Sequence, residues 1–499
     1  MAGVHGLGRT LGLARVTECD FLVVGGGSAG CIIAKRLSER TTGRIILLEA
    51  GKSDEGDGAA TDLSRLDEQT SEYDWGFRAA TLAGRPPELD YARARTLGGC
   101  ANHNDCAFLR PPDSDFAEWE KLGATGWGAA AMAAYFHRVL ENTNVEQAPH
   151  HPASAAFVQA GKELGLREID FQSGIAEGIG YFPLNAIGRL RQSSSVTYLH
   201  PVSKLPANLE VWTQTQATRI IVENRNAVGA ETRRGTIRAK RAVILTCGAI
   251  QTPQLMMLSG LGPARHLREH GISVLANLPA VGQHLRDHVA APIVWETHEP
   301  IAPWKICPFE ATLMLKIDAD APAPDVLFHF GLRVREKYGE DPRLAVSGPA
   351  VKASPNVTRA KSEGSVTLTA AGYRAPLRID LNYFADPYDL RILLGAMRFT
   401  RRLMETPSFQ ALCKAEVHPG PDVQSDDEWV GYIKSVCETV YHPCGTAAIG
   451  HVVAPDLRVK GVANLIVADA SIFPSLITTN INCAVMMAAE KAADLILPK

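Results

Sequence analysis

The chain has 499 residues, which is longer than a single hydrophobic core usually serves, so two structural domains are expected. Hydrophobic residues make up 46% and charged residues 21% of the chain, as in a soluble globular enzyme and unlike a disordered protein. Lys and Arg total 51 against 54 Asp and Glu, so the net charge of -3 provides no basic surface for a nucleic-acid partner.

Residues 1–16 are broken up by glycines and lack the apolar run of a signal peptide, so we expect a loose leader there. No segment approaches the ~18 consecutive apolar residues that would span a bilayer, so no membrane partner is expected. The ten cysteines are scattered, without a CxxC pair or a Cys/His cluster, which predicts no metal site. Together these features predict a cytoplasmic protein with reduced thiols.

A glycine-rich turn between a strand and a helix opens the folded part of the chain. An apolar strand at 20–24 is followed by the pattern GxGxxG and then by an amphipathic helix. The first glycine allows the tight turn, the second lets the backbone approach a pyrophosphate, and the third permits close packing of helix on strand. Amides at the helix N-terminus then bind the anion. The residues expected to meet the cofactor here are Gly25, Gly27, Ser28, Ala29 and Gly30.

A second apolar strand, at 45–48, ends on Glu49 and completes a βαβ unit. An acid at this position is placed to accept hydrogen bonds from a ribose diol, and it disfavours the 2′-phosphate of NADP. The glycine pattern therefore predicts a dinucleotide cofactor, but by itself it does not separate FAD from NAD.

Further elements follow along the chain. An apolar strand at 242–246 enters a helix that extends to about 258. Residues 364–384 alternate between apolar and polar, as in antiparallel strands with one wet face, and we expect a helix over 387–404 to cover that sheet. A last strand is expected at 465–469.

Four segments, in this order, resemble the glucose-methanol-choline (GMC) oxidoreductase family of flavoenzymes. They are the glycine turn with Glu49, residues 94–104 (ARTLGGCANHN), residues 247–263, and the C-terminal Tyr441-His442-Pro443 with Asp469 and Asn482. The resemblance implies an α/β fold with a doubly wound FAD-binding domain and a discontinuous substrate domain whose antiparallel sheet roofs the flavin. We assign 17–155, 198–295 and 440–499 to the FAD-binding domain, and 156–197 and 296–439 to the substrate domain.

The loop at 94–104 is similar to the one that carries a covalently bound flavin in the choline-oxidase branch of the family. The resemblance makes His103 a candidate for a histidyl-FAD bond; the alternative is a histidine that packs near the flavin without a bond. The remaining residues that the resemblance assigns to FAD are Arg95, Gly98, Gly99, Asn102, Asn104, Asp469 and Ala470.

The resemblance also implies oxidation of a primary alcohol by hydride transfer to flavin N5. An alkoxide expels hydride more readily than an alcohol, so a group must accept the hydroxyl proton, and histidine titrates nearest to neutral pH. His442 is assigned to activating the hydroxyl and Asn482 to orienting its oxygen.

Substrate contacts are assigned to Glu310, Asp105 and Tyr441. A carboxylate in an apolar pocket is unfavourable unless it meets a cation, so a buried Glu310 would indicate a cationic or amino-sugar-like alcohol. Choline itself, an aminoglycoside intermediate, and a lyase or a non-catalytic flavoprotein on the same fold are the alternatives. The sequence leaves open whether O2 or another acceptor reoxidises the flavin, and whether the chain forms a homodimer.

Overall fold

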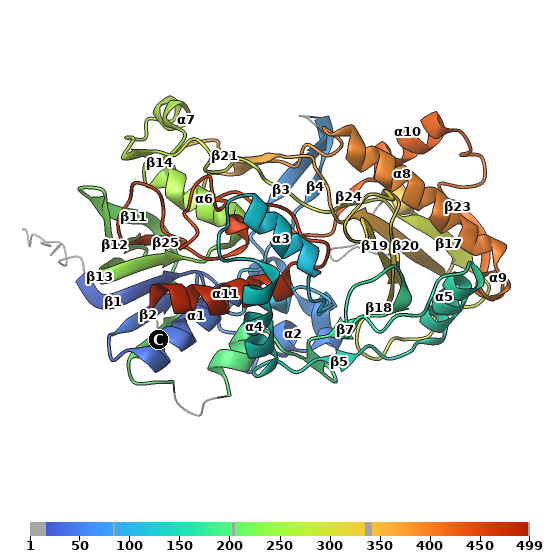
Figure 1. The fold of residues 1–499 in the computed structure, drawn as a ribbon, viewed down its shortest axis with the longest axis horizontal. Coiled ribbons are helices and arrows are strands. Elements are labelled where there is room, and N and C mark those ends of the chain that lie inside the picture. The colour runs from blue at the N-terminus through green and yellow to red at the C-terminus, as the bar shows by residue number, and fades with distance from the viewer. Residues whose placement is uncertain (1–15, 83–84, 202–204, 335–341, 498–499) are drawn as a thin grey trace, which may run out of the picture.

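Two large β-sheets lie side by side along the long axis of the molecule (Figure 1). The structure is a computed structural model that describes residues 16–82, 85–201, 205–334 and 342–497. The expected leader therefore lies outside the described residues, except for Val16, which begins the first strand.

The first sheet has seven strands, and β1 (Val16–Val24) lies parallel between β2 (Ile45–Leu48) and β13 (Gly235–Leu245). These strands are rich in Val, Ile and Leu and end in runs without polar residues, as expected of parallel strands buried on both faces. The others are parallel β10 (Leu209–Trp212) beside β2, parallel β25 (Leu465–Val467) beside β13, and antiparallel β12 (Asn226–Thr232) and β11 (Ala217–Glu223).

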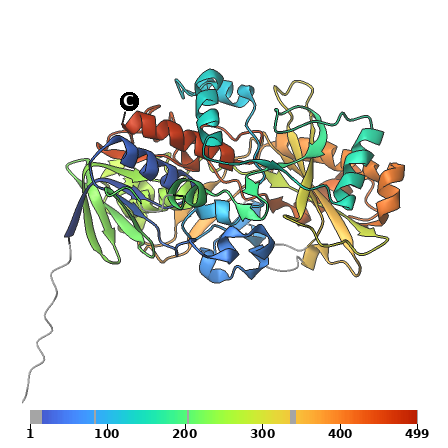
Figure 2. The same cartoon turned by 90° about the horizontal axis from the view of Figure 1, so that it is seen from below.

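Helices lie on both sides of this sheet: Figure 1 shows α6 (Gly248–Leu258) above its strands and α1 (Ser28–Arg40) and α11 (Asn482–Ile496) below. Figure 2 shows α11, the last helix, running beside α1, the first. Helix α4 (Ala129–Leu140) packs on α11. The βαβ unit and the strands expected near 242–246 and 465–469 are therefore present.

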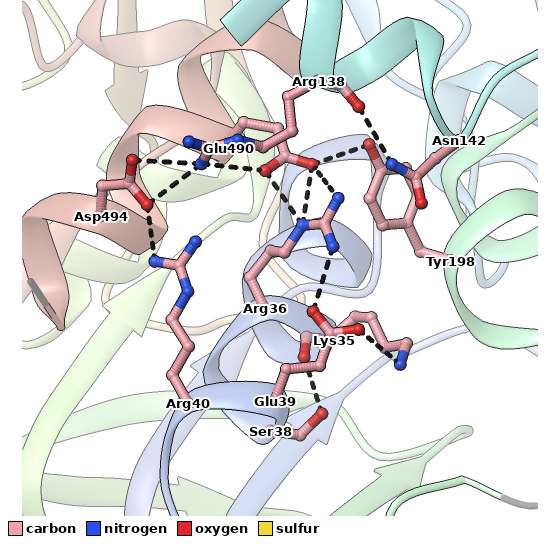
Figure 3. A network of polar contacts seen from close by, with 10 residues as sticks. All are labelled: Lys35, Arg36, Ser38, Glu39, Arg40, Arg138, Asn142, Tyr198, Glu490 and Asp494. Atoms are coloured by element: carbon pink, nitrogen blue, oxygen red, sulfur yellow. Dashed lines mark hydrogen bonds and ion pairs between the residues drawn. The ribbon is translucent and has the colours of Figure 1, made fainter. Parts of the chain in front are cut away.

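An ion-pair network joins α1, α4 and α11 (Figure 3). The Glu490 side chain is completely buried, and its two oxygens each accept a 3.0 Å hydrogen bond from Arg36 Nε. The Tyr198 hydroxyl donates to the same carboxylate at 2.9 Å, and Arg138 Nη1 lies 3.6 Å from it. Because α1 and α11 both begin at the central cavity described below, this network fixes the relative positions of two helix N-termini there.

The second sheet has eight antiparallel strands, with β20 (Ala350–Val357) between β17 (Ile293–Thr297) and β19 (Val326–Gly331). Its other strands are β6 (Gly178–Tyr181), β16 (Val289–Ala290), β18 (Phe309–Leu315), β23 (Cys413–His418) and β24 (Glu438–Thr439). The helices packed around it are α5 (Pro152–Glu163), α8 (Pro387–Arg401), α9 (Pro407–Leu412) and α10 (Asp426–Val436).

The alternating residues at 364–384 do form strands, β21 (Ser365–Leu368) and β22 (Leu377–Asp380), but not in the large sheet. They pair instead with β3 (Arg78–Leu82) and β4 (Arg85–Asp90) in a separate four-stranded sheet. Helix α8 packs on β20, β17 and β19 of the large sheet, so the expectation that it covers 364–384 was wrong. Alternation identifies a strand with one wet face, but it does not identify the strand's partner.

Shorter elements complete the chain. They are α2 (Gly58–Thr61), α3 (Asp113–Lys121), α7 (Ala264–Glu269), β5 (Glu146–Gln147), β7 (Pro183–Leu184), β8 (Ala186–Ile187), β9 (Leu190–Arg191), β14 (Leu261–Gly262) and β15 (Ala276–Asn277). The predicted domain boundaries stay a prediction, although β16 and part of β17 lie in the segment assigned to FAD and belong to the large antiparallel sheet. No helix within the described ranges is long and apolar enough to cross a bilayer.

Candidate active site

A cavity of about 380 Å³ extends from the carboxyl ends of β1 and β2 to the inner face of the eight-stranded sheet. At one end it is lined by Glu49 and the glycine turn, and at the other by His329 and His442. The carboxyl ends of parallel strands are the usual ligand site of doubly wound sheets.

The glycine turn has the close contacts that the motif predicts. Gly25 has a φ of +107°, and a Cβ there would lie 2.5 Å from the Thr246 carbonyl oxygen. A Cβ on Gly30 would lie 1.9 Å from the Gly25 carbonyl oxygen, so this glycine serves the packing of α1 and does not line the cavity. Gly27, Ser28 and Ala29 line the cavity at the N-terminus of α1.

Glu49 lines the same end, where its two oxygens accept hydrogen bonds from Gly26 N at 2.9 Å and Gly51 N at 2.6 Å. Burial raises the pKa of Glu49 to about 7, against the lowering effect of these amides. The backbone therefore fixes the carboxylate in one orientation at the cavity wall.

The loop at 94–104 crosses over the glycine turn. Gly99 has a φ of +61°, and a Cβ there would lie 2.7 Å from Gly27 Cα, so two glycines meet where the loop passes the turn. His103 and Asn104 line the cavity, and His103 Nδ1 lies 3.9 Å from the Asp74 carboxylate. Asp105 also lines it.

Other residues predicted to contact the cofactor instead stabilise this loop on its side away from the cavity. Asn102 Nδ2 donates to Asp54 Oδ2 at 2.9 Å and to the Leu97 carbonyl at 2.7 Å, and the Arg95 guanidinium lies over Trp75. Asn102, Arg95 and Gly98 do not line the cavity, so the structure corrects their assignment as direct contacts. Asp469 and Ala470 do line it, and Asp469 Oδ2 accepts from Gly248 N at 2.8 Å.

At the opposite end, His442 is held on three sides. Its backbone N donates to Asp287 Oδ1 at 2.8 Å, and its Nδ1 lies 2.8 Å from His288 Nδ1. Its Nε2 lies 3.4 Å from Asn480 Nδ2, which is also 3.3 Å from His329 Nε2. Burial, followed by the neighbouring histidines, lowers the pKa of His442 well below its usual value.

Tyr441, which lines the cavity, has an uncommon φ of +63° for an aromatic residue. Its N–H donates to Thr439 Oγ1 at 2.7 Å, and its carbonyl accepts from Arg93 Nη2 at 2.8 Å. These two hydrogen bonds hold Tyr441 in its strained backbone conformation, directly before His442 in the chain.

The structure corrects the assignment of Asn482. Its Oδ1 accepts a 2.8 Å hydrogen bond from the Ser28 hydroxyl at the glycine turn, whereas Asn480 is the amide beside His442. Asn482 is the first residue of α11 and Asn480 ends the preceding loop, so two asparagines one residue apart face different ends of the cavity.

Glu310 also departs from its assignment. The residue before it, Phe309, lines the cavity, but Glu310, which lies where the β18–β19 register shifts, does not. The side chain is 1% exposed, and its Oε2 accepts from His151 N at the start of α5, at 2.7 Å. Glu310 therefore anchors a helix and gives no support for a cationic substrate.

Sequence reasoning missed His288, His329 and Asn480, together with Lys352 and Glu438, which also line the cavity wall or support it. One signal was present: His329 is the single polar residue of the strand VLFHFG, and Lys352 is the single charged residue of the strand AVKASPNV. No group of three or more metal-ligating side chains gathers anywhere in the described ranges.

Two family models, both described as GMC oxidoreductase, match residues 19–290 and 360–489. The chain belongs to the GMC oxidoreductase family. It is 35% identical to choline oxidase from Arthrobacter globiformis, over 96% of this chain and 94% of that one, and 32% identical to an acceptor-dependent alcohol dehydrogenase from Pseudomonas putida, over 96% of each. The suspected family is thereby confirmed.

Solved GMC structures share the fold. Pyridoxine 4-oxidase from Mesorbium loti superposes with a TM-score of 0.88 and 27% identity over 95% of this chain and 98% of that one. Formate oxidase gives a TM-score of 0.86 and 25% identity, over 97% of this chain and 99% of that one. The predicted α/β fold class is confirmed, and this GMC protein is an FAD-dependent oxidoreductase of the kind that acts on alcohols.

The cavity of this GMC chain fits FAD. The meeting of Gly27 and Gly99 leaves room for a pyrophosphate at the N-terminus of α1, and Glu49 supplies a fixed acceptor for ribose hydroxyls. Glu49 would therefore hold the adenosine end, and the region of His103, Asn480 and His442 would receive the flavin end.

Proposed function

We propose that this chain oxidises a primary alcohol, with His442 accepting the hydroxyl proton and Asn480 holding the hydroxyl oxygen. The observation that carries the proposal is the pair His442 and Asn480 at the end of the cavity opposite Glu49. FAD, when bound, supplies the hydride acceptor at N5.

The hydrogen bonds of His288 define which nitrogen of His442 can act as the base. His288 Nε2 lies 3.1 Å from the Thr358 carbonyl oxygen and 2.9 Å from that of Ile477. Carbonyl oxygens only accept, so His288 carries its proton on Nε2, and its Nδ1 accepts from His442 Nδ1–H. Burial favours the neutral form of both rings because it lowers both pKa values. The lone pair of His442 therefore lies on Nε2, the nitrogen that faces Asn480, so a substrate hydroxyl would reach it by displacing this amide.

Asn480 is suited to orient the hydroxyl oxygen. Its Nδ2 is within reach of both His442 and His329, while its buried Oδ1 accepts no hydrogen bond from any described residue. A buried acceptor of this kind is unfavourable unless a ligand meets it. The reacting hydroxyl has one proton, which goes to His442, so its oxygen would accept from Asn480 Nδ2–H, and a donor elsewhere on the ligand would meet Oδ1.

The test is anaerobic mixing of the purified flavoprotein with a panel of alcohols. Bleaching of the flavin absorbance by a primary alcohol, slowed about 10² to 10⁴-fold by His442→Ala, supports the proposal. A flavoprotein that no alcohol bleaches would instead revive the lyase or non-catalytic alternative.

We further propose that FAD is attached covalently through His103, a cavity-lining histidine beside Asn104. Acid-precipitated wild-type protein should keep its yellow colour, and the peptide containing His103 should carry the mass of FAD. His103→Ala should give a colourless pellet. Colour in both pellets would move the attachment elsewhere, and colour in neither would leave FAD bound without a covalent bond.

For the substrate, the electron acceptor and the oligomeric state, we propose only a general class. Relatives are named for choline, and a solved neighbour for pyridoxine. Glu310 does not line the cavity. Of the two acidic residues predicted to contact the substrate, only Asp105 lines it and supports a cationic or amino-sugar-like substrate. We keep O2 or another acceptor, a homodimer and a cytoplasmic location as proposals, to be tested by oxygen consumption, light scattering and cell fractionation.

A further inference from the structure

Strand β20 is buried along its whole length, yet it carries polar side chains at alternate positions. Lys352, Ser354 and Asn356 share one face, and Val351 and Ala353 share the other. Lys352 and Ser354 line the cavity. The inner face of the large sheet therefore presents polar groups to whatever fills the cavity.

Lys352 forms an ion pair with Glu438, which also lines the cavity. Lys352 Nζ lies 3.6 Å from Glu438 Oε1, which accepts a 2.9 Å hydrogen bond from the Ser354 hydroxyl. The two charged side chains are only 5% and 13% exposed. A buried ion pair often stabilises a fold no better than apolar residues of the same size, so its position in a cavity wall favours a role in recognition.

The Lys352–Glu438 ion pair lies next to the end of the cavity that is lined by His329 and His442. Ser354 stands opposite His329 in the ladder, and Lys352 stands opposite Gly331. A Cβ on Gly331 would lie 3.2 Å from Lys352 Cγ, so the glycine leaves room for the lysine stem. Burial lowers the pKa of His329 to about 3, and the nearby His288 and Lys352 act in the same direction.

We propose that Lys352 and Glu438 bind the substrate, and that this substrate is a polyhydroxylated, sugar-like alcohol. The ammonium donates to one substrate hydroxyl while the carboxylate accepts from its neighbour, so a pair of adjacent hydroxyls satisfies both. A quaternary ammonium alcohol would bring a second cation beside Lys352, and an acidic alcohol would bring a second anion beside Glu438. This inference rests on the proposed alcohol oxidation.

The test uses the flavin-loaded enzyme with methyl β-glucoside, benzyl alcohol and choline. The double variant Lys352→Met/Glu438→Gln removes both charges and so leaves no unpaired buried ion. It should lower kcat/KM for the glucoside by about tenfold or more, mainly through KM, because two charge-assisted hydrogen bonds are lost. Its kcat/KM for benzyl alcohol should fall less than its kcat/KM for the glucoside, because benzyl alcohol has no second hydroxyl for the pair to bind. Lys316→Met, at an exposed lysine, is the matched control.

A binding measurement on the wild-type holoenzyme does not depend on the variant folding or on turnover. 6-Deoxyglucose, which lacks the primary hydroxyl, should perturb the flavin spectrum at lower concentration than tetramethylammonium. Tighter binding of tetramethylammonium, or an equal loss with all three alcohols in the double variant, would overturn the inference. Binding of 6-deoxyglucose without flavin reduction by any alcohol would instead count against the proposed function and leave this recognition in place.

Discussion

His442 is placed to act as a base because its neighbours fix its tautomer. Its Nδ1–H is committed to His288, whose own proton is committed to two carbonyls, so the assignment follows from groups that can only accept. The structure thereby orients a proton acceptor without a carboxylate at the ring.

The pH dependence of flavin reduction follows from the depressed pKa of His442. Because burial favours the neutral ring, the base is already in its active form at neutral pH, and protonation inactivates it only in acid. Stopped-flow reduction should therefore be independent of pH above about 6.5, the ordinary histidine pKa, and should fall only below it. A wild-type profile that rises through an apparent pKa above 7 would contradict this assignment.

The two asparagines make a matched pair of variants. Asn480→Ala should slow flavin reduction about 10²-fold at unchanged flavin content, since it removes the amide beside His442. Asn482→Ala removes a hydrogen bond to Ser28 at the cofactor end, so it should lower flavin content while leaving the rate per bound flavin nearly unchanged. The reverse result would restore the original assignment of Asn482.

At the scale of elements, α1 and α11 are the first and last helices of the described residues; both begin at the cavity, and a buried ion pair joins them farther along (Figure 3). Cofactor binding thus depends on contacts between the two ends of the sequence. Neither helix carries a signal in its own sequence that identifies the other as its partner.

Glu490→Gln tests this connection. The change leaves Arg36, whose side chain is 15% exposed, without its buried carboxylate, and breaking such a pair costs about 3–5 kcal/mol. Denaturant unfolding should show that loss, and gel filtration should show release of any flavin not covalently attached. Glu39→Gln is the control, because Glu39 pairs with the same arginine but is 37% exposed, and should cost less than about 1 kcal/mol. Equal losses of unfolding free energy in the two variants would mean that the buried ion pair stabilises the fold no more than the exposed one.

On the scale of the whole molecule, the cavity is formed by segments from both large sheets and from the loop at 94–104. FAD bound there would touch the native chain at many points and the unfolded chain at few. The folded state is consequently coupled to cofactor concentration.

His103→Ala gives a form from which FAD can be removed if the histidyl bond exists. The stripped variant should unfold at a lower temperature, and added FAD should raise the thermal midpoint with concentration, reflecting a stabilisation of about 2.7 kcal/mol at a hundredfold excess over Kd. Differential scanning fluorimetry follows the shift. A midpoint that does not respond to FAD would mean that the cavity is not the cofactor site.

Features that depend on short-range stereochemistry can be predicted from the amino-acid sequence. The glycine turn, Glu49 after the second strand, and the strand-forming alternation at 364–384 follow from φ/ψ limits and side-chain periodicity within a few residues. The family and FAD also followed, since their motifs are local.

Contacts between residues far apart in the chain are visible only in the folded molecule. The tertiary structure placed Asn480 instead of Asn482 beside His442, turned Glu310 to a helix, and brought Lys352 and Glu438 to one wall of the cavity. The physical reason is that a strand's face, its ladder partner and the approach of distant segments depend on packing across the whole chain, which periodicity along the sequence does not encode.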